Sequence, residues 1–264
     1  GHEFYSKVCE LILRLRGNFL WPAMWCWTFY DDDPLNSKVA DEMGVVVSTS
    51  HHEPMARNHQ EWSRHRKEYG EWNYATNQKV IDKFFAEGIR RMKGTEDVVT
   101  IGMRGDGDGP MSEDADIKLL ERIIKNQRSI IADETGRPAK ETPQVWALYK
   151  EVQDYYDKGL RVPDDVIMLL ADDNWGNVTP IQNMWEQLSL TYEYGVDKLW
   201  VLNVGDLKPM EYPISLFMDM AWNPMHYTAE SLLKHPHAFC TQLFGEVQAD
   251  EAARILNLYS KYNG

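Results

Sequence analysis

Apolar residues occur in two alternating patterns along the chain, which predict helices and strands in turn. Segments with an apolar residue at every third or fourth position alternate with short, continuous apolar runs. The first helical segment runs from Glu3 to Arg16 and ends before Gly17. Further helices are predicted at 35–43, 74–93, 113–134 and 180–194, after 149, and from Tyr212 onward. Strands are predicted at 19–24, 45–47, 98–103, 144–149, 166–170 and 199–204.

Alternating strands and helices favour parallel strands joined by crossover helices. The strand at Val166–Leu170 is wholly apolar, as expected for a strand buried on both faces. No repeat or low-complexity linker divides the chain. We therefore predict an α/β fold of the (β/α)8 TIM-barrel type, with residues 1–264 as one domain and C-terminal helices from about 212.

Polar side chains follow five of the predicted strands. Because parallel strands end at the same edge of a sheet, and active sites of such folds lie there, these side chains are expected to share one site. The segments are Ser50–Glu53, Arg104–Asp108, Lys150–Glu151, Asp172–Asn174 and Asn203–Asp206.

The residue types at these ends suit carbohydrate chemistry. Two carboxyl groups can flank a glycosidic bond, one as general acid and the other as base or nucleophile. Arg104 has the fork geometry that binds a substrate carboxylate through two hydrogen bonds. The Asp106-Gly-Asp108 pair is similar to metal ligands but lacks the remaining spacing of a calcium loop, so we expect no metal and no cofactor.

Charge and aromatic content narrow the partners. The net charge of −13, from 41 acidic and 28 basic residues, argues against nucleic acid or an anionic membrane as partner. No apolar run is long enough to span a bilayer, and the N-terminal segment has no apolar signal core. The 10 Trp, 13 Tyr and 8 Phe include many beside turn residues, where they would serve as stacking platforms for sugars.

Six segments resemble, in the same order, the catalytic barrel of glycoside hydrolase family 115, the xylan α-1,2-glucuronidases. They are Asn18–Met24 (NFLWPAM), Thr49–Met55 (TSHHEPM), Ile101–Asp108 (IGMRGDGD), Tyr149–Tyr156 (YKEVQDYY), Ala171–Gly176 (ADDNWG) and Asn203–Glu211 (NVGDLKPME). The resemblance implies inverting removal of (4-O-methyl)glucuronic acid from a glucuronic-acid-bearing oligosaccharide or polysaccharide. It also implies a periplasmic or secreted parent.

The resemblance also implies roles for individual residues. Glu151 would be the general acid, and Asp108 or Asp172 would orient the attacking water. The sugar would be bound by Arg104, His51, Asn174, Trp175 and Asn203.

The sequence departs from the family at two kinds of place. The family pattern has a further strand with a Tyr-His-x-Asp-Tyr stretch between the ADDNWG segment and the helix at 180. This chain lacks that stretch, because Val178 follows Asn177 directly. The six predicted strands are thus two fewer than a closed barrel requires. Changes at Val47-Ser48, Trp25–Thr28 and Gly109 cluster at strand ends, as expected of an engineered pocket rim.

These departures leave two alternatives open. The first alternative is ester hydrolysis by a Cys–His dyad. Cys26 follows one predicted strand and His51 and His52 follow the next, so neighbouring strands could bring the thiol and an imidazole together. The other is a sugar-binding remnant without catalysis. Unpaired sheet edges would in addition favour an oligomer.

Overall fold

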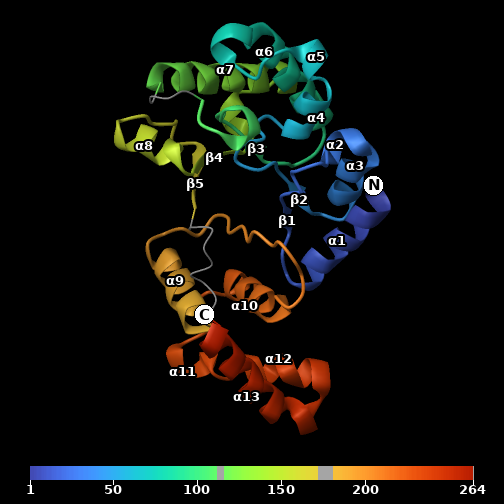
Figure 1. The fold of residues 1–264 in the computed structure, drawn as a ribbon, viewed down its shortest axis with the longest axis vertical. Coiled ribbons are helices and arrows are strands. Elements are labelled where there is room, and N and C mark those ends of the chain that lie inside the picture. The colour runs from blue at the N-terminus through green and yellow to red at the C-terminus, as the bar shows by residue number, and fades with distance from the viewer. Residues whose placement is uncertain (112–115, 172–180, 264) are drawn as a thin grey trace. The chain divides into compact units, whose positions relative to one another are not determined.

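The computed structural model describes residues 1–111, 116–171 and 181–263 (Figure 1). The chain forms two compact units. The first unit comprises Gly1–Leu11 and Asn18–Ala171, and the second unit comprises Ile12–Gly17 and Asp172–Gly264.

The first unit is built on parallel strands, as predicted. They are β1 (Phe19–Leu20), β2 (Val46–Val47), β3 (Val99–Thr100), β4 (Gln144–Leu148) and β5 (Val166–Leu170). β1 pairs with β2, and β3, β4 and β5 form a second sheet in chain order. The backbone N–H of Val98 donates to the carbonyl of Val47 at 3.0 Å, which links the two sheets.

Helices precede and connect these strands. They are α1 (His2–Arg14), which runs into the second unit, α2 (Phe29–Asp32), α3 (Leu35–Glu42), α4 (His59–Arg64), α5 (Arg66–Tyr69), α6 (Tyr74–Arg91), α7 (Ile117–Thr135) and α8 (Glu151–Asp157). α6 and α7 pack side by side (Figure 1). The buried residues of α7, among them Leu120, Ile123 and Ile131, recur at helical spacing and join the main core.

The described residues of the second unit form helices joined by loops, without strands. Its helices are α9 (Ile181–Glu193), α10 (Glu211–Trp222), α11 (Ala229–Leu232), α12 (His235–Phe244) and α13 (Glu246–Asn263). Its core is formed by Met184, Tyr212, Leu216, Phe217, Met220 and Leu232.

Three strand predictions were wrong in whole or in part. Residues 199–204 form no strand, and Trp200 and Leu202 instead pack against the helical core of the second unit. β5 is not buried on both faces, since Met168 and Leu170, which share one face of the strand, are exposed. The predicted strand at 19–24 ends at Leu20, two residues before Pro22, which has no N–H to donate.

The fold is thus mixed α/β and rich in helix, with short parallel sheets. No closed barrel is formed by the residues that the structure describes. None of the helices in these ranges has the length and apolar character needed to cross a membrane.

Candidate active site

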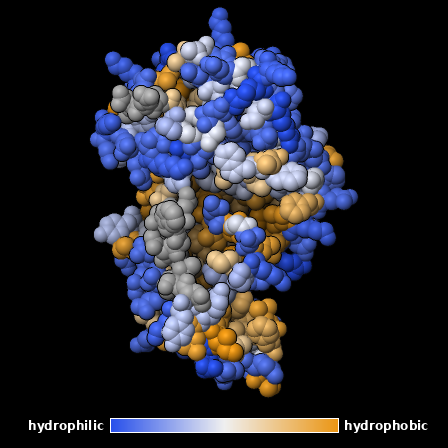
Figure 2. All heavy atoms as spheres, viewed as in Figure 1, coloured by the Kyte–Doolittle hydropathy of each residue, from blue (hydrophilic) through white to orange (hydrophobic). Residues whose placement is uncertain are grey.

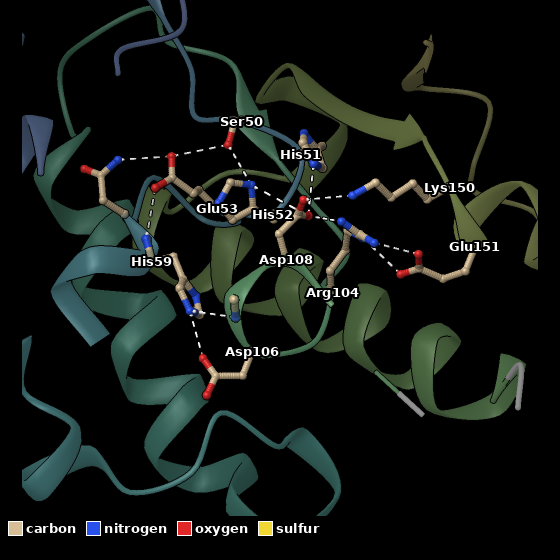
Figure 3. A network of polar contacts seen from close by, with 12 residues as sticks. Ser50, His51, His52, Glu53, His59, Arg104, Asp106, Asp108, Lys150 and Glu151 are labelled. Atoms are coloured by element: carbon tan, nitrogen blue, oxygen red, sulfur yellow. Dashed lines mark hydrogen bonds and ion pairs between the residues drawn. The ribbon is translucent and has the colours of Figure 1, made fainter. Parts of the chain in front are cut away.

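Three loops at the carboxyl ends of β2, β3 and β4 bring polar side chains together, as the parallel topology predicts (Figure 3). The loop after β2 carries Ser50, His51, His52 and Glu53. The loops after β3 and β4 carry Arg104 to Asp108 and Lys150 with Glu151.

Arg104 holds the two central carboxylates on one buried guanidinium. Its Nε and Nη2 donate to the Glu151 carboxylate oxygens at 2.9 and 2.6 Å, and its Nη1 is ion-paired with Asp108. The side chain is 3% exposed. In this structure the donors that would bind a substrate carboxylate are therefore already engaged, and that role of Arg104 stays a prediction.

The backbone beneath Arg104 is fixed from two sides. The side chain of Gln127 on α7 donates to the carbonyl of Gly102 and accepts from its N–H, both at 2.7 Å. The indole Nε1 of Trp72 donates to the carbonyl of Arg104 at 3.0 Å. These bonds satisfy backbone groups beyond the end of β3, where no strand partner remains.

The two acids of the Asp106-Gly-Asp108 segment point to different places, so they do not act as a pair. Asp106 forms a bidentate ion pair with Arg66 of α5, at 2.6 and 2.8 Å. Gly107 and Asp108 have φ angles of 62° and 65°, and this left-handed turn directs Asp108 into the site. There it lies 3.1 Å from Nε2 of His51 and 3.3 Å from Nζ of Lys150.

Burial keeps both histidines neutral. It lowers the pKa of His51 to about 4, with further lowering by the charges of Arg104 and Lys150. It lowers the pKa of His52 to about 3, with help from His51. The ring of Trp25 stacks on His52 at 4.9 Å, and Tyr149 meets His51 edge-on at 4.7 Å.

Glu53 lies beneath the histidines and is 1% exposed. Its carboxylate accepts from the backbone N–H of His59, from the Asn58 amide and from the Ser50 hydroxyl. Burial raises the pKa of Glu53 to about 7, against the lowering effect of these bonds.

One group among the described side chains has the geometry of a metal site. The ligand atoms of His51, His52 and Asp108 all lie within 4.8 Å of one another. However, Arg104 and Lys150 already place two positive charges on Asp108, and they would repel a cation there. The expectation that no metal binds stays a prediction.

The remaining predicted site residues fall outside the described part of the first unit. Asp172, Asn174 and Trp175 lie outside the described residues. Asn203 is exposed and belongs to the second unit. The predicted sugar contacts of these residues therefore stay predictions.

The Cys26 thiol is free and exposed, and among the described contacts no hydrogen bond joins it to His51 or His52. Its neighbour Trp25 does stack on His52, so the segment that carries Cys26 reaches the site. The dyad stays a prediction.

The network in Figure 3 also includes Ser50, Glu53 and Lys150, to which the sequence gave no individual role, and His59, which it did not indicate. Ser50 and Glu53 lie in the polar segment after β2, and Lys150 lies in the polar segment after β4, so their positions at strand ends did indicate the site. His59 begins a six-residue helix, which is too short to show periodicity, and no pattern around it pointed to the site.

A parallel α/β unit with carboxylates at its strand ends is typical of glycoside hydrolases. The sequence profile of glycosyl hydrolase family 115 matches residues 1–183 and 177–264, and the chain belongs to that family. The two matches overlap at 177–183, which includes the point where Asn177 runs into Val178. This agrees with a family segment being absent there.

Among solved structures, the chain is similar to a family 115 4-O-methyl-α-glucuronidase with specificity for decorated arabinogalactans. The TM-score is 0.91 and the sequence identity is 29%, over 100% of this chain. The chain spans 40% of the length of that structure. A search of curated proteins gave no match.

Proposed function

We propose that the chain hydrolyses the bond between a (4-O-methyl)glucuronic acid side chain and a xylan or arabinogalactan, with inversion. The observation that carries the proposal is the pair of carboxylates, Glu151 and Asp108, held on one buried guanidinium at the carboxyl edge of parallel strands. Membership of family 115 and the glucuronidase activity named for the similar structure support it.

In this mechanism Glu151 is the general acid and protonates the leaving oxygen. Asp108 is the base and takes a proton from the water that attacks the anomeric carbon from the opposite face. His51 donates to Asp108 and holds it in place. Inversion requires a separation of roughly 6.5–9.5 Å between the two carboxyl groups when substrate is bound.

Arg104 links substrate binding to this chemistry. A general acid must carry a proton, whereas Glu151 is ion-paired with Arg104 in the structure. The carboxylate of the glucuronic acid can compete for the Arg104 donors, because it offers the same bidentate geometry. Substrate then replaces Glu151 on Arg104 and frees Glu151 to be protonated.

The remaining parts of the site belong to the same proposal. Asp172 is a further candidate acid, and Asn174, Trp175 and Asn203 are candidate sugar contacts. The parallel strands follow the barrel plan of the family, as one domain, with strands absent near Asn177.

Replacement of the acid tests the function. Glu151→Gln removes the transferable proton but keeps the shape of the side chain, so glucuronic acid release should fall about 10²–10⁴-fold. The control is Asp154→Asn, an exposed carboxylate on the same helix, which should leave the rate unchanged. Release from glucuronoxylan and from arabinogalactan oligosaccharides is followed by NMR, which also identifies the first anomer formed.

Full activity in Glu151→Gln would remove Glu151 from the acid role. A wild-type chain that binds glucuronic acid in calorimetry but releases none from either polymer would instead be a sugar-binding protein. An initial α-anomer product would exclude inversion.

The position of Trp25 against His52 favours a second candidate, ester hydrolysis by Cys26 with a histidine. Turnover of an activated ester, and its loss in Cys26→Ala, would support this activity. Equal turnover by Cys26→Ala would exclude it.

A further inference from the structure

Glu53 is a buried carboxylate that has no cationic partner among the described ion pairs. The neighbouring buried acid, Glu61, is by contrast paired with both Arg57 and Arg91 at 2.8 Å. Glu53 is satisfied only by neutral donors. Burial of a carboxylate without an opposite charge is costly, so a role for this one is expected.

The Ser50 hydroxyl connects Glu53 to His52. Ser50 Oγ donates its one proton to Oε2 of Glu53 at 3.3 Å. The same oxygen lies 3.2 Å from Nδ1 of His52, and it can only accept there because its proton is already used. His52 must therefore carry its proton on Nδ1.

The other ring nitrogen of His52 gives independent support. Nε2 is buried and has no partner among the described residues. In the Nδ1–H tautomer it is an acceptor without a donor. The other tautomer would bury an N–H donor without an acceptor, which folded proteins tolerate less.

Both histidines lie near the same carboxylate oxygen of Asp108. Its Oδ1 lies 4.0 Å from Nδ1 of His52 and 3.1 Å from Nε2 of His51. A carboxylate only accepts hydrogen bonds, so His51 is the Nε2–H tautomer. The two adjacent histidines thus carry opposite tautomers: Nε2–H of His51 donates to Asp108, whereas Nδ1–H of His52 donates to Ser50 and lies on the side of its ring that is nearer to Asp108.

We propose that Glu53, acting through Ser50, fixes His52 in the Nδ1–H tautomer and thereby places the positive end of an N–H dipole, rather than a lone pair, on the side of the ring nearer to Asp108. Glu53 is then a positioning residue for the base. Its effect on rate rests on the proposed function, whereas the tautomer does not. In the other tautomer a lone pair of His52 would face the Asp108 carboxylate and repel it.

The tautomer is measured directly by ¹H–¹⁵N correlation NMR on the whole chain labelled at histidine. The pH is set about two units above the Glu53 pKa of about 7, where Glu53 is ionised. In the wild type, His52 should be Nδ1–H and His51 Nε2–H. Spectra of His51→Gln and His52→Gln assign the two signals.

Glu53→Gln should switch His52 to Nε2–H. The introduced amide can donate to Ser50, and it can also donate to Oδ1 of Asn58, which accepts from no donor in the described part of the chain. The Ser50 proton is then free to turn to Nδ1 of His52. Ser50→Ala, which removes only the hydroxyl, should give a mixture of tautomers and serves if the glutamine variant fails to fold.

Asp97→Asn is the matched control. Asp97 is also a buried carboxylate bonded by neutral donors, the N–H of Val47 and the hydroxyl of Thr95. It contacts neither Ser50 nor His52 in the described network, so the tautomer and the rate should be unchanged.

The activity of the same variants tests the positioning role. Glu53→Gln and Ser50→Ala should lower kcat about tenfold with KM little changed, since outer-shell partners have effects of this order. An Nε2–H His52 in the wild type, or Nδ1–H retained in both variants, overturns the proposal. A switched tautomer with unchanged kcat overturns the link to catalysis. A wild type without glucuronidase activity contradicts the proposed function alone, since the spectra still decide the tautomer.

Discussion

Burial, more than ion pairing, sets the pKa values of three side chains in the site. Burial lowers the pKa of His51 and of His52, and it raises the pKa of Glu53. These shifts have opposite consequences for stability, because the histidines resist protonation in the folded state while the carboxyl group favours it. The pH dependence of unfolding therefore reports the state of each residue.

We expect variants at these positions to change the pH slope of stability in opposite directions. Between about pH 4 and 6.5 the unfolded chain protonates His51 while the folded chain does not, so stability falls as pH falls through this window. His51→Asn should make that slope less steep by about 1.4 kcal/mol per pH unit. Between about pH 4.5 and 7 the folded chain holds the extra proton on Glu53, so stability from this group falls as pH rises. Glu53→Gln should make the net slope steeper by a similar amount.

Urea unfolding at several values between pH 5 and 6.5 measures the slopes. Differences between variants are compared, because burial also lowers the pKa of His59 and of His235. A slope in His51→Asn equal to that of the wild type would contradict the burial effect at this residue.

The helices and strands differ in how well local sequence defines them. The helices α3, α6 and α9 begin within one residue of their predicted starts, since apolar spacing and turn residues are local signals. The helices α2, α4 and α5 span only four to six residues and were missed, because they are too short to show a period. The predicted strand at 199–204 failed for another reason, since a strand requires a partner and apolar content alone does not supply one.

The end of α7 gives a prediction for a single element. Gly136 ends this helix in the left-handed region, at φ 73° and ψ 18°, and its N–H donates to the carbonyl of Ala132. A Cβ there would meet nothing within 4 Å, so the cost of a side chain is purely conformational. Gly136→Ala should lower the free energy of unfolding by about 1 kcal/mol, measured by denaturant titration. In Gly205→Ala, at an equally open glycine without positive φ, stability should be unchanged or slightly raised.

For the molecule as a whole, topology predicted where the site lies but not how its members are partnered. Parallel strands explain why the segments after β2, β3 and β4 meet, since their carboxyl ends share an edge. The ion pair between Arg104 and Glu151, and the burial of Glu53 among neutral donors, depend on tertiary packing. Local sequence does not encode that packing. Residue type and spacing did not distinguish Asp106 from Asp108, and only the family resemblance singled out Asp108, which a left-handed turn directs into the site.

The second unit exposes much apolar surface for a chain of this size. Figure 2 shows hydrophobic side chains over the C-terminal helices, at the lower end of the view. One group, which we call the corner patch, lies where α12 meets α13 and consists of Leu243, Phe244 and Val247. These side chains are 58%, 57% and 90% exposed. Because contiguous exposed apolar side chains favour contact with another apolar surface, the chain is expected to self-associate through this patch.

Self-association through the corner patch can be tested by adding charge to it. Burial of an exposed Phe or Val contributes about 1.5–3 kcal/mol, so Phe244→Asp with Val247→Asp should weaken association at least about tenfold in sedimentation velocity. The aspartate at 247 lies in the first turn of α13, where a negative charge suits the helix dipole, so the helix itself should persist. Leu35→Asp, at an exposed apolar position that begins α3 in the first unit, is the matched control and should associate as the wild type does. Equal association in the double variant and the control would mean that another surface joins the copies. A wild type that stays monomeric at all concentrations would mean that exposed apolar area at this corner is insufficient to hold two chains together.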